Sequence, residues 1–268
     1  MTLADAKFGG SIPQLYERLL VPLIFQPYAD DMAARVAGSR PARVLEIAAG
    51  TGVVTRALAQ CLPASSTIVA TDLNQAMLDQ AIATGTARAV QWRQADAMHL
   101  PFPDAAFDVV ACQFGAMFFP DKVAAFAEAR RVLHPGGRFI FNVWDRIEDN
   151  DFAAVVTDAL AQAFPVDPPR FLARTPHGYH DLAVIAEELA RAGFTTPPAC
   201  TTLAARSRAA TSDVPAIAYC QGTPLRNEIA ASLLADATAV ATAAIARRFG
   251  TGPVDGKIQA HVIVVARS

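Results

Sequence analysis

The sequence predicts an α/β protein built on a doubly wound, mostly parallel sheet of seven strands. Apolar, β-branched runs alternate with amphipathic helical stretches, an alternation typical of parallel strands joined by helical crossovers. One run, at residues 43–47, leads directly into a glycine turn and a helix. About half of the 268 residues are hydrophobic, which is enough for a sizeable buried core.

The strands are predicted where apolar runs are bounded by turn residues. They cover Arg43–Ile47, Thr67–Thr71, Val90–Arg93, Phe107–Gln113, Arg138–Val143, Ala199–Ala205 and Ala260–Ala266. The helices that follow them are marked by Val53–Ala59, Gln75–Ala83, Lys122–Val132 and Asp181–Ala192. Leu133–Gly137 predicts a turn, because proline fixes φ and the glycines tolerate positive φ.

Three segments exceed this strand–helix repeat. Residues 11–37 are expected to be helical with breaks at Pro22 and Pro27, and residues 146–180 and 207–257 are expected to be inserts. Both inserts follow strands expected to run parallel to the first, at the edge where ligands of open α/β sheets bind. We therefore predict one domain over residues 1–268, with its core at about 40–145, 181–206 and 258–268 and the inserts as a helical lid.

Composition excludes several classes. The formal net charge is −2, which argues against nucleic-acid binding, since that function needs a basic face. The apolar run Leu19–Phe25 is interrupted by Pro22 and is far below the ~20 residues of a membrane span. The four cysteines are scattered without a C-x-x-C, which favours reduced thiols in the cytoplasm and no metal site. Arg130/Arg131 and Arg247/Arg248 are interpreted as solvated helix faces.

The most informative stretch is the turn between the first strand and the next helix. Gly50 and Gly52 lack a Cβ, so the backbone there can turn sharply and approach a ligand closely. The helix that follows offers free backbone N–H groups. By itself the pattern also fits an ordinary strand-to-helix connection.

Acidic residues follow the next two strands. Asp72 stands about twenty residues beyond Gly52, where nucleotide-binding folds place an acid that bonds ribose hydroxyls; an N-cap is the alternative role. Asp96 follows the third strand at the same edge. Asp108 begins the fourth strand and is assigned to structure, and His99 is interpreted as a bystander in a polar loop.

Residues 44–143 as a whole resemble the class I S-adenosylmethionine (SAM)-dependent methyltransferases. The pattern is closest to the small-molecule group that includes the ubiquinone/menaquinone C-methyltransferases. The matching motifs, in order, are LEIAAGTG, ATDLNQAML, ADAMHLPFPDAAFDVV and LHPGGRF. The resemblance implies a Rossmann-like fold, SAM as cofactor and transfer of a methyl group to a small molecule.

The same resemblance implies roles for individual residues. Asp72 would hold the ribose, and Tyr16 would reach over the cofactor or else pack its helix. The remaining residues are Glu46, Ala48, Gly50 and Gly52 along the methionine portion, Leu73 and Met77 beside the adenine, Asp96 and Ala97 at its edge, and Gln113 and Phe114 near the sulfonium. Ala48 departs from the pattern, since many members have a glycine there, and slight crowding is expected.

Methyl transfer needs little more than an in-line nucleophile held close to the sulfonium. A base helps if the acceptor must lose a proton, and His177 and His180 of the first insert are the candidates, with a loop or helix-start role as the favoured alternative. A small, apolar acceptor is expected from side chains in the inserts. These are Phe152, Phe164, Phe171, Leu172, Ile217 and Tyr219.

Two other functions would also fit the glycine turn and the acid after the second strand. A nicotinamide-dependent oxidoreductase also uses a glycine turn and an acid after the second strand, but the third glycine of G-x-G-x-x-G is missing here. A non-catalytic SAM-binding protein would carry the same cofactor motifs. The acceptor, the methylated atom and the oligomeric state are not encoded in any motif of this sequence.

Overall fold

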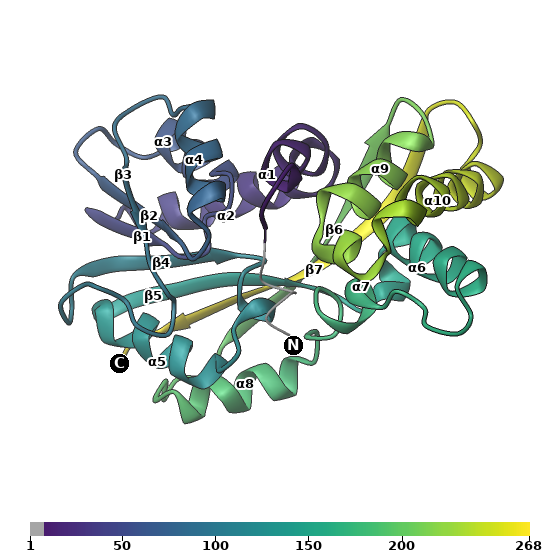
Figure 1. Cartoon of the computed structure of the whole chain (residues 1–268). Helices are drawn as coiled ribbons and strands as arrows, with labels where there is room; N and C mark the ends of the chain where they lie inside the picture. The colour runs from purple at the N-terminus through teal and green to yellow at the C-terminus, as the bar shows by residue number, and fades with distance from the viewer. Residues whose placement is uncertain (1–7) are drawn as a thin grey trace. The chain divides into compact units, whose positions relative to one another are not determined.

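A computed structural model describes residues 8–268 and contains one seven-stranded sheet of strand order β3-β2-β1-β4-β5-β7-β6 (Figure 1). The strands are β1 (Arg43–Glu46), β2 (Thr67–Asp72), β3 (Gln91–Gln94), β4 (Phe107–Gln113), β5 (Leu133–Trp144), β6 (Ala199–Ala209) and β7 (Val254–Ala266). The first five pair in parallel. The order reverses between β1 and β4, so the carboxyl ends of these two strands flank the topological switch point, where ligands of such sheets bind.

β7 runs antiparallel to β5. The backbone N–H of Arg267 donates to the carbonyl of Gly137, whereas the N–H of Asp145 donates to the carbonyl of Gln259. Residue numbers thus rise along β5 as they fall along β7. The predicted seven-stranded, mostly parallel α/β sheet is confirmed, with β7 as its antiparallel member.

Packing divides the chain into two compact units. The first holds the described residues up to Gln26, Trp144–Tyr179 and Leu203–Ala260, and the second holds Pro27–Val143, His180–Thr202 and His261–Ser268. The first contains most residues of the predicted inserts. The prediction of a single domain with a lid over residues 146–180 and 207–257 stays a prediction.

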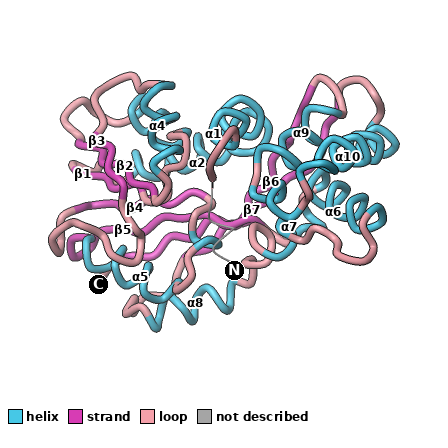
Figure 2. The backbone as a smooth tube through the Cα atoms, in the orientation of Figure 1, coloured by secondary structure: helices cyan, strands magenta, loops and turns pink. Residues whose placement is uncertain are grey.

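Helices cover both faces of the sheet within the second unit. The helices α2 (Gln26–Gly38), α3 (Val53–Cys61) and α4 (Gln75–Thr84) lie on one face (Figure 1; the same view is coloured by secondary structure in Figure 2). The opposite face carries α5 (Lys122–Val132) and α8 (Leu182–Arg191). The expected crossover helices are therefore present, and α5 has the predicted bounds.

The first unit is mostly helical. Its α-helices are α1 (Ile12–Leu15), α6 (Asp151–Ala163), α7 (Phe171–Arg174), α9 (Asp213–Gly222) and α10 (Leu234–Phe249). Short 3₁₀ turns lie at Ile147–Asp149, Pro224–Glu228 and Ala231–Leu233 of this unit, and at Ala116–Phe118 of the second unit. None of the helices in residues 8–268 combines the length and apolarity that crossing a bilayer requires.

The predicted helix breaks at Pro22 and Pro27 are wrong. Pro22 lies inside a π-helical stretch, Tyr16–Phe25, and helix continues on both sides. The wider π turn shifts the hydrogen-bond pattern to five residues, which accommodates a residue without an N–H. Pro27 follows Gln26, whose backbone N–H still donates to the carbonyl of Val21, so the helix runs through Pro27 into α2 without a break.

The predicted turn at Leu133–Gly137 is also corrected. Leu133 pairs with Phe107 and Arg138 pairs with Val109, so β5 has already begun at Leu133. The extra residues between these pairs form a bulge in which Gly136 has φ +80°. The proline and glycines therefore bend the start of the strand without ending the pairing.

Aromatic packing between α5 and the sheet anchors the core of the second unit. Phe126 of α5 and Phe139 and Phe141 of β5 are fully buried. Their ring centroids lie 4.7–5.6 Å apart. Such contacts add to the free energy of burying apolar area.

We expect Phe139→Ala to lower the free energy of unfolding by about 3–5 kcal/mol, because it opens a cavity beneath α5. Urea denaturation followed by circular dichroism measures this loss. Val166→Ala is the control: Val166 is 98% exposed, so its truncation should change stability by less than ~0.5 kcal/mol. Equal, small losses for both variants would contradict this description of the core.

Candidate functional site

The glycine turn after β1 and the acid at the end of β2 meet directly. The backbone N–H of Gly50 donates to Asp72 Oδ2 at 2.8 Å. Asp72 Oδ1 accepts from the backbone N–H of Asn74, also at 2.8 Å, and the residue is only 7% exposed. The two elements therefore share the carboxyl edge of the sheet. The alternative role of Asp72 as an N-cap is not observed, since Asn74 occupies the cap position of α4.

The turn itself depends on left-handed backbone at three positions. Ala48, Gly50 and Gly52 have φ values of +54°, +56° and +83°. A Cβ on Gly50 would meet only the end of the Met77 side chain, at 3.6 Å, but one on Gly52 would lie 2.9 Å from the Trp92 ring. Gly52 is thus required for packing between the turn and β3, in addition to its backbone conformation.

Glu46, at the end of β1, is a buried acid. It is 1% exposed, and Thr55 donates its hydroxyl to Glu46 Oε2 at 2.5 Å. Burial raises the pKa of Glu46 from 4.5 to about 8, against the lowering effects of the Thr55 bond and the charge of Arg56. Burial also raises the pKa of Asp72, partly offset by its bonds to Asn74 and Gly50. Two buried carboxyl groups therefore stand beside the turn, and the charge of Arg56 offsets only part of the effect of burial on Glu46.

One residue of the turn was missed by the residue-by-residue prediction. Thr51 is 1% exposed, and its hydroxyl has no hydrogen-bond partner among the described residues. A buried, unsatisfied hydroxyl is costly, and a polar group of a bound ligand would satisfy it. Its place between the two glycines was the available signal. The polar groups beside it, carboxylate acceptors and backbone N–H donors, suit a nucleoside that carries amino and hydroxyl groups.

The residues predicted to surround the adenine differ in exposure. Leu73 is 53% exposed, whereas Met77 is 3% exposed beneath Gly50. Asp96 Oδ1 accepts from the backbone N–H of Met98, and Ala97 between them is half-buried. Asp72 and Leu73 on one side and Asp96 and Ala97 on the other follow paired strands, since β2 pairs with β3.

Arg131 binds the segment that follows Asp96, which differs from the role predicted for it. Its guanidinium donates to the side chains of Glu128 and Asp104 and to the carbonyls of Leu100 and Phe102. The interpretation of Arg131 as part of a solvated helix face is wrong. It holds the Leu100–Asp104 part of the segment between β3 and β4.

The loop after β4 carries the residues predicted near the sulfonium. Phe114 is buried with φ +53°, and its backbone N–H donates to Asn142 Oδ1 at 2.9 Å. Asn142 Nδ2 reaches Gln113 Oε1 at 3.5 Å. Asn142 of β5 therefore holds this loop, a long-range contact that no motif in the sequence indicated.

The remaining candidates belong to other parts of the chain. Tyr16 lies in the first unit, where its ring stacks on Phe25 with centroids 4.8 Å apart. His177 of the same unit is buried, and its Nδ1 lies 2.8 Å from the carbonyl oxygen of Asp145. His180 is a half-buried residue of the second unit. No cluster of three or more His, Cys, Asp or Glu side chains suited to a metal occurs within residues 8–268.

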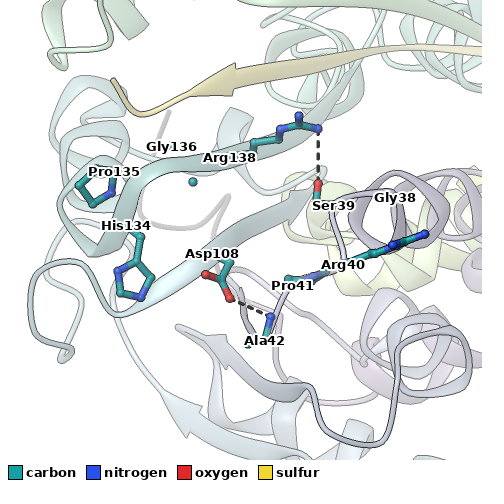
Figure 3. A pocket seen from close by; sticks show the side chains of 11 residues that line it. Gly38, Ser39, Arg40, Pro41, Ala42, Asp108, His134, Pro135, Gly136 and Arg138 are labelled. Carbon is teal, nitrogen blue, oxygen red and sulfur yellow. Dashed lines mark hydrogen bonds between the residues drawn. The ribbon is translucent and has the colours of Figure 1, made fainter.

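A cavity of about 540 Å³ lies at the opposite edge of the sheet (Figure 3). It is lined by the segment that precedes β1, by Asp108 near the start of β4 and by the bulge of β5. Asp108 Oδ2 accepts from the backbone N–H groups of Ala42 and Arg43 at 2.8 Å, so its predicted structural role is confirmed. The cavity is separate from the carboxyl-edge residues described above.

The buried Glu46 gives stability a definite pH dependence. Its pKa is higher in the folded chain, so unfolding releases a proton between about pH 4.5 and 8 and this group's contribution falls as pH rises through that window. Relative to the wild type, Glu46→Gln should therefore gain at least ~1 kcal/mol of stability between pH 5 and pH 8. Urea denaturation at both pH values measures the difference.

Thr55→Val is the companion variant. The Thr55 bond lowers the pKa of Glu46, so its removal should extend the loss of stability to higher pH than in the wild type. Parallel pH profiles for the wild type and both variants would show that Glu46 does not titrate in this range.

Comparison with known proteins agrees with this arrangement. Residues 45–141 match a family model described as a methyltransferase domain. The ubiquinone/menaquinone biosynthesis C-methyltransferase UbiE of Ectopseudomonas mendocina (strain ymp) is 35% identical over 207 residues, which are 72% of this chain and 75% of that protein. The enzyme of the same name from Teredinibacter turnerae is 42% identical over 52% of each chain.

Among solved structures, a SAM-dependent methyltransferase from Thermotoga maritima superimposes with a TM-score of 0.55 at 16% identity, covering 100% of both chains. That likeness shows the fold alone. Membership of the family and the identity of the cofactor are shown by the relatives and the family model. The chain belongs to the class I SAM-dependent methyltransferases, in the group that resembles UbiE, and SAM is its cofactor.

Proposed function

We propose that this methyltransferase binds SAM at the carboxyl ends of β1, β2 and β4 and methylates a small, apolar acceptor of the quinone-precursor class. The contact between Gly50 and Asp72 carries the cofactor part of this proposal. It brings a close-approach turn and a ribose-binding acid to one place at the switch point of the sheet. The proposed cofactor residues are Glu46, Ala48, Gly50, Thr51, Gly52, Asp72, Leu73, Met77, Asp96, Ala97, Gln113 and Phe114, with Tyr16 as a further candidate.

Each part of the site has a task that its chemistry supports. Each oxygen of the Asp72 carboxylate can accept a second hydrogen bond, so Asp72 can take ribose hydroxyls while it holds Gly50 and Asn74. The hydroxyl of Thr51 would form a hydrogen bond with the methionine portion of SAM. Glu46 and Asp72 favour a positively charged ligand, because a nearby cation stabilises their ionised forms.

Bound SAM supplies an electrophilic methyl group on a sulfonium. The chain then has to hold the acceptor in line with that group and exclude water, which contributes the larger part of such a rate enhancement. His177 is the candidate base for an acceptor that must lose a proton. Because the Asp145 carbonyl can only accept, it places the imidazole proton on Nδ1 and leaves Nε2 as the basic nitrogen.

The acceptor class is supported by the relatives. UbiE proteins are named for C-methylation in ubiquinone and menaquinone biosynthesis. The side chains of the inserts give less support, because Phe152, Phe171 and Leu172 are at most 3% exposed and pack the interior of the first unit. The two inserts are proposed to cover the acceptor, and a cytoplasmic location stays a prediction.

The direct experiment is methyl transfer from labelled SAM to a panel of acceptors. Apolar hydroquinones and phenols should accept label, whereas hydrophilic amines and nucleic acids should not. Selective labelling of a polar or polymeric acceptor would overturn the proposed class. Mass spectrometry of the product then identifies the methylated atom, which we expect to be a ring carbon.

Asp72→Ala tests the cofactor site. We expect a loss of at least ~1.4 kcal/mol in SAM binding, a tenfold rise in Kd, because ribose contacts and the anchor of Gly50 are both removed. Isothermal titration calorimetry measures the change. Asp79→Ala is the matched control, since Asp79 is an acid on the exposed face of α4 that accepts a hydrogen bond from Gln75; unchanged affinity in Asp72→Ala would remove this residue from the site.

A further inference from the structure

The loops after β1 and β4 touch at one point, between Ala48 and Gly115. A Cβ built on Gly115 would lie 2.4 Å from the Ala48 Cβ and 2.8 Å from the Cys112 sulfur. Both separations are well inside van der Waals contact, which begins near ~3.5 Å for carbon atoms. The Ala48 methyl group therefore occupies the space that a side chain at position 115 would need.

The backbone of Gly115 does not itself require glycine. Its φ and ψ are −95° and −36°, values that any residue adopts. Gly115 also lies among buried neighbours, with Ala116 fully buried and Cys112 fully buried. The exclusion of a side chain at this position thus arises only from the contact with Ala48 and Cys112.

Cys112 ties the same loop from below. Its sulfur lies 2.8 Å from the place of a Cβ on Gly115, and the nearby backbone N–H groups of Gly115 and Ala116 lower the pKa of the Cys112 thiol, which burial raises. The turn after β4 is consequently held against β4 at the place where it meets the turn after β1. We call the contact among Cys112, Gly115 and Ala48 the interlock.

Each loop of the interlock also contains strained backbone. Ala48 and Phe114 both have positive φ, at +54° and +53°, a region that residues other than glycine seldom adopt. Strain of this kind persists only where the surrounding structure over-determines it, and it concentrates at ligand sites. Here the constraints are the interlock on one side and the Asn142 bond to Phe114 on the other.

We infer that Gly115 is a positioning residue for SAM, because the Ala48–Gly115 contact sets the spacing between the loop that carries Gly50 and the loop that carries Gln113 and Phe114. Gly115 has no side chain with which to bind the cofactor. It acts by allowing the two loops to approach. The inference rests on the proposed cofactor site, and it explains how an alanine is accommodated at position 48, where the methyltransferase pattern often has glycine.

The test exchanges one methyl group between the two positions. Gly115→Ala should weaken SAM binding at least tenfold, because the added methyl pushes the loops apart. The double variant Ala48→Gly/Gly115→Ala keeps the total volume constant, and volume-conserving exchanges are tolerated best. The double variant should bind SAM at least threefold more tightly than Gly115→Ala. It should still bind more weakly than the wild type, because the contact with Cys112 remains.

Gly137→Ala is the matched control. Its Cβ would also crowd its neighbours, at 2.9 Å from two backbone oxygens, but Gly137 lies at the opposite edge of the sheet, next to the cavity of Figure 3. It should lower the thermal unfolding midpoint and leave the Kd of SAM unchanged. Calorimetric Kd values for SAM and S-adenosylhomocysteine, KM and kcat, and unfolding midpoints are measured for all variants.

The outcomes are distinguishable. If the wild type binds no SAM, the proposed function fails. If it binds SAM, an unchanged Kd in Gly115→Ala, or a double variant that binds no better than Gly115→Ala, overturns the interlock. If Gly115→Ala does not fold, the double variant decides alone: folding with SAM affinity within tenfold of the wild type supports the interlock, and failure to fold or bind overturns it.

Discussion

The hydrogen bond from the Gly50 N–H to the Asp72 carboxylate is the contact on which the rest of the site depends. It links the turn after β1 to the end of β2 across 22 residues of sequence. A second bond, from the Ala49 N–H to the Thr71 carbonyl, joins the same turn to β2, but only the Gly50 bond joins the turn to the Asp72 side chain. The same carboxylate also binds the N–H of Asn74, so one side chain organises the starts of two helical segments.

The same arrangement buries two carboxyl groups, whose ionised forms are unfavourable away from water. Glu46 and Asp72 are both buried, and burial raises the pKa of each. A buried carboxyl group without a cation favours its neutral form. A ligand with positive charge relieves this penalty, whereas a neutral ligand of the same shape does not. The proposed site would thus favour a sulfonium over the thioether that remains after methyl transfer.

Much of the fold could be predicted because its signals are local. β4 and α5 lie within the predicted bounds, since an apolar run and an amphipathic period are written in consecutive residues. That Asp72 lies beside the glycine turn could be predicted from the spacing of the two along the chain. The errors at Pro22 and Leu133 have a common cause: proline there is accommodated by a π-helical stretch and by a β-bulge, and neither has a strong signal in a single sequence.

The missed parts of the site depend on contacts between distant residues. Asn142 is separated from Phe114 by 28 residues, and Gly115 meets Ala48 only after the sheet has formed. Thr51 was visible in the motif, but its buried, unpaired hydroxyl required coordinates to recognise. The two inserts contain no motif that we could assign to an acceptor, so the proposed acceptor rests on the likeness to UbiE proteins rather than on the geometry of this chain.

The most direct test of the proposed site is a crystal structure of the protein with S-adenosylhomocysteine. We expect the ribose hydroxyls to lie within hydrogen-bond distance of the Asp72 carboxylate, with the homocysteine portion over residues 48–52. A nucleoside bound elsewhere, or side chains of the protein filling the space between Asp72 and the glycine turn, would contradict the proposed site.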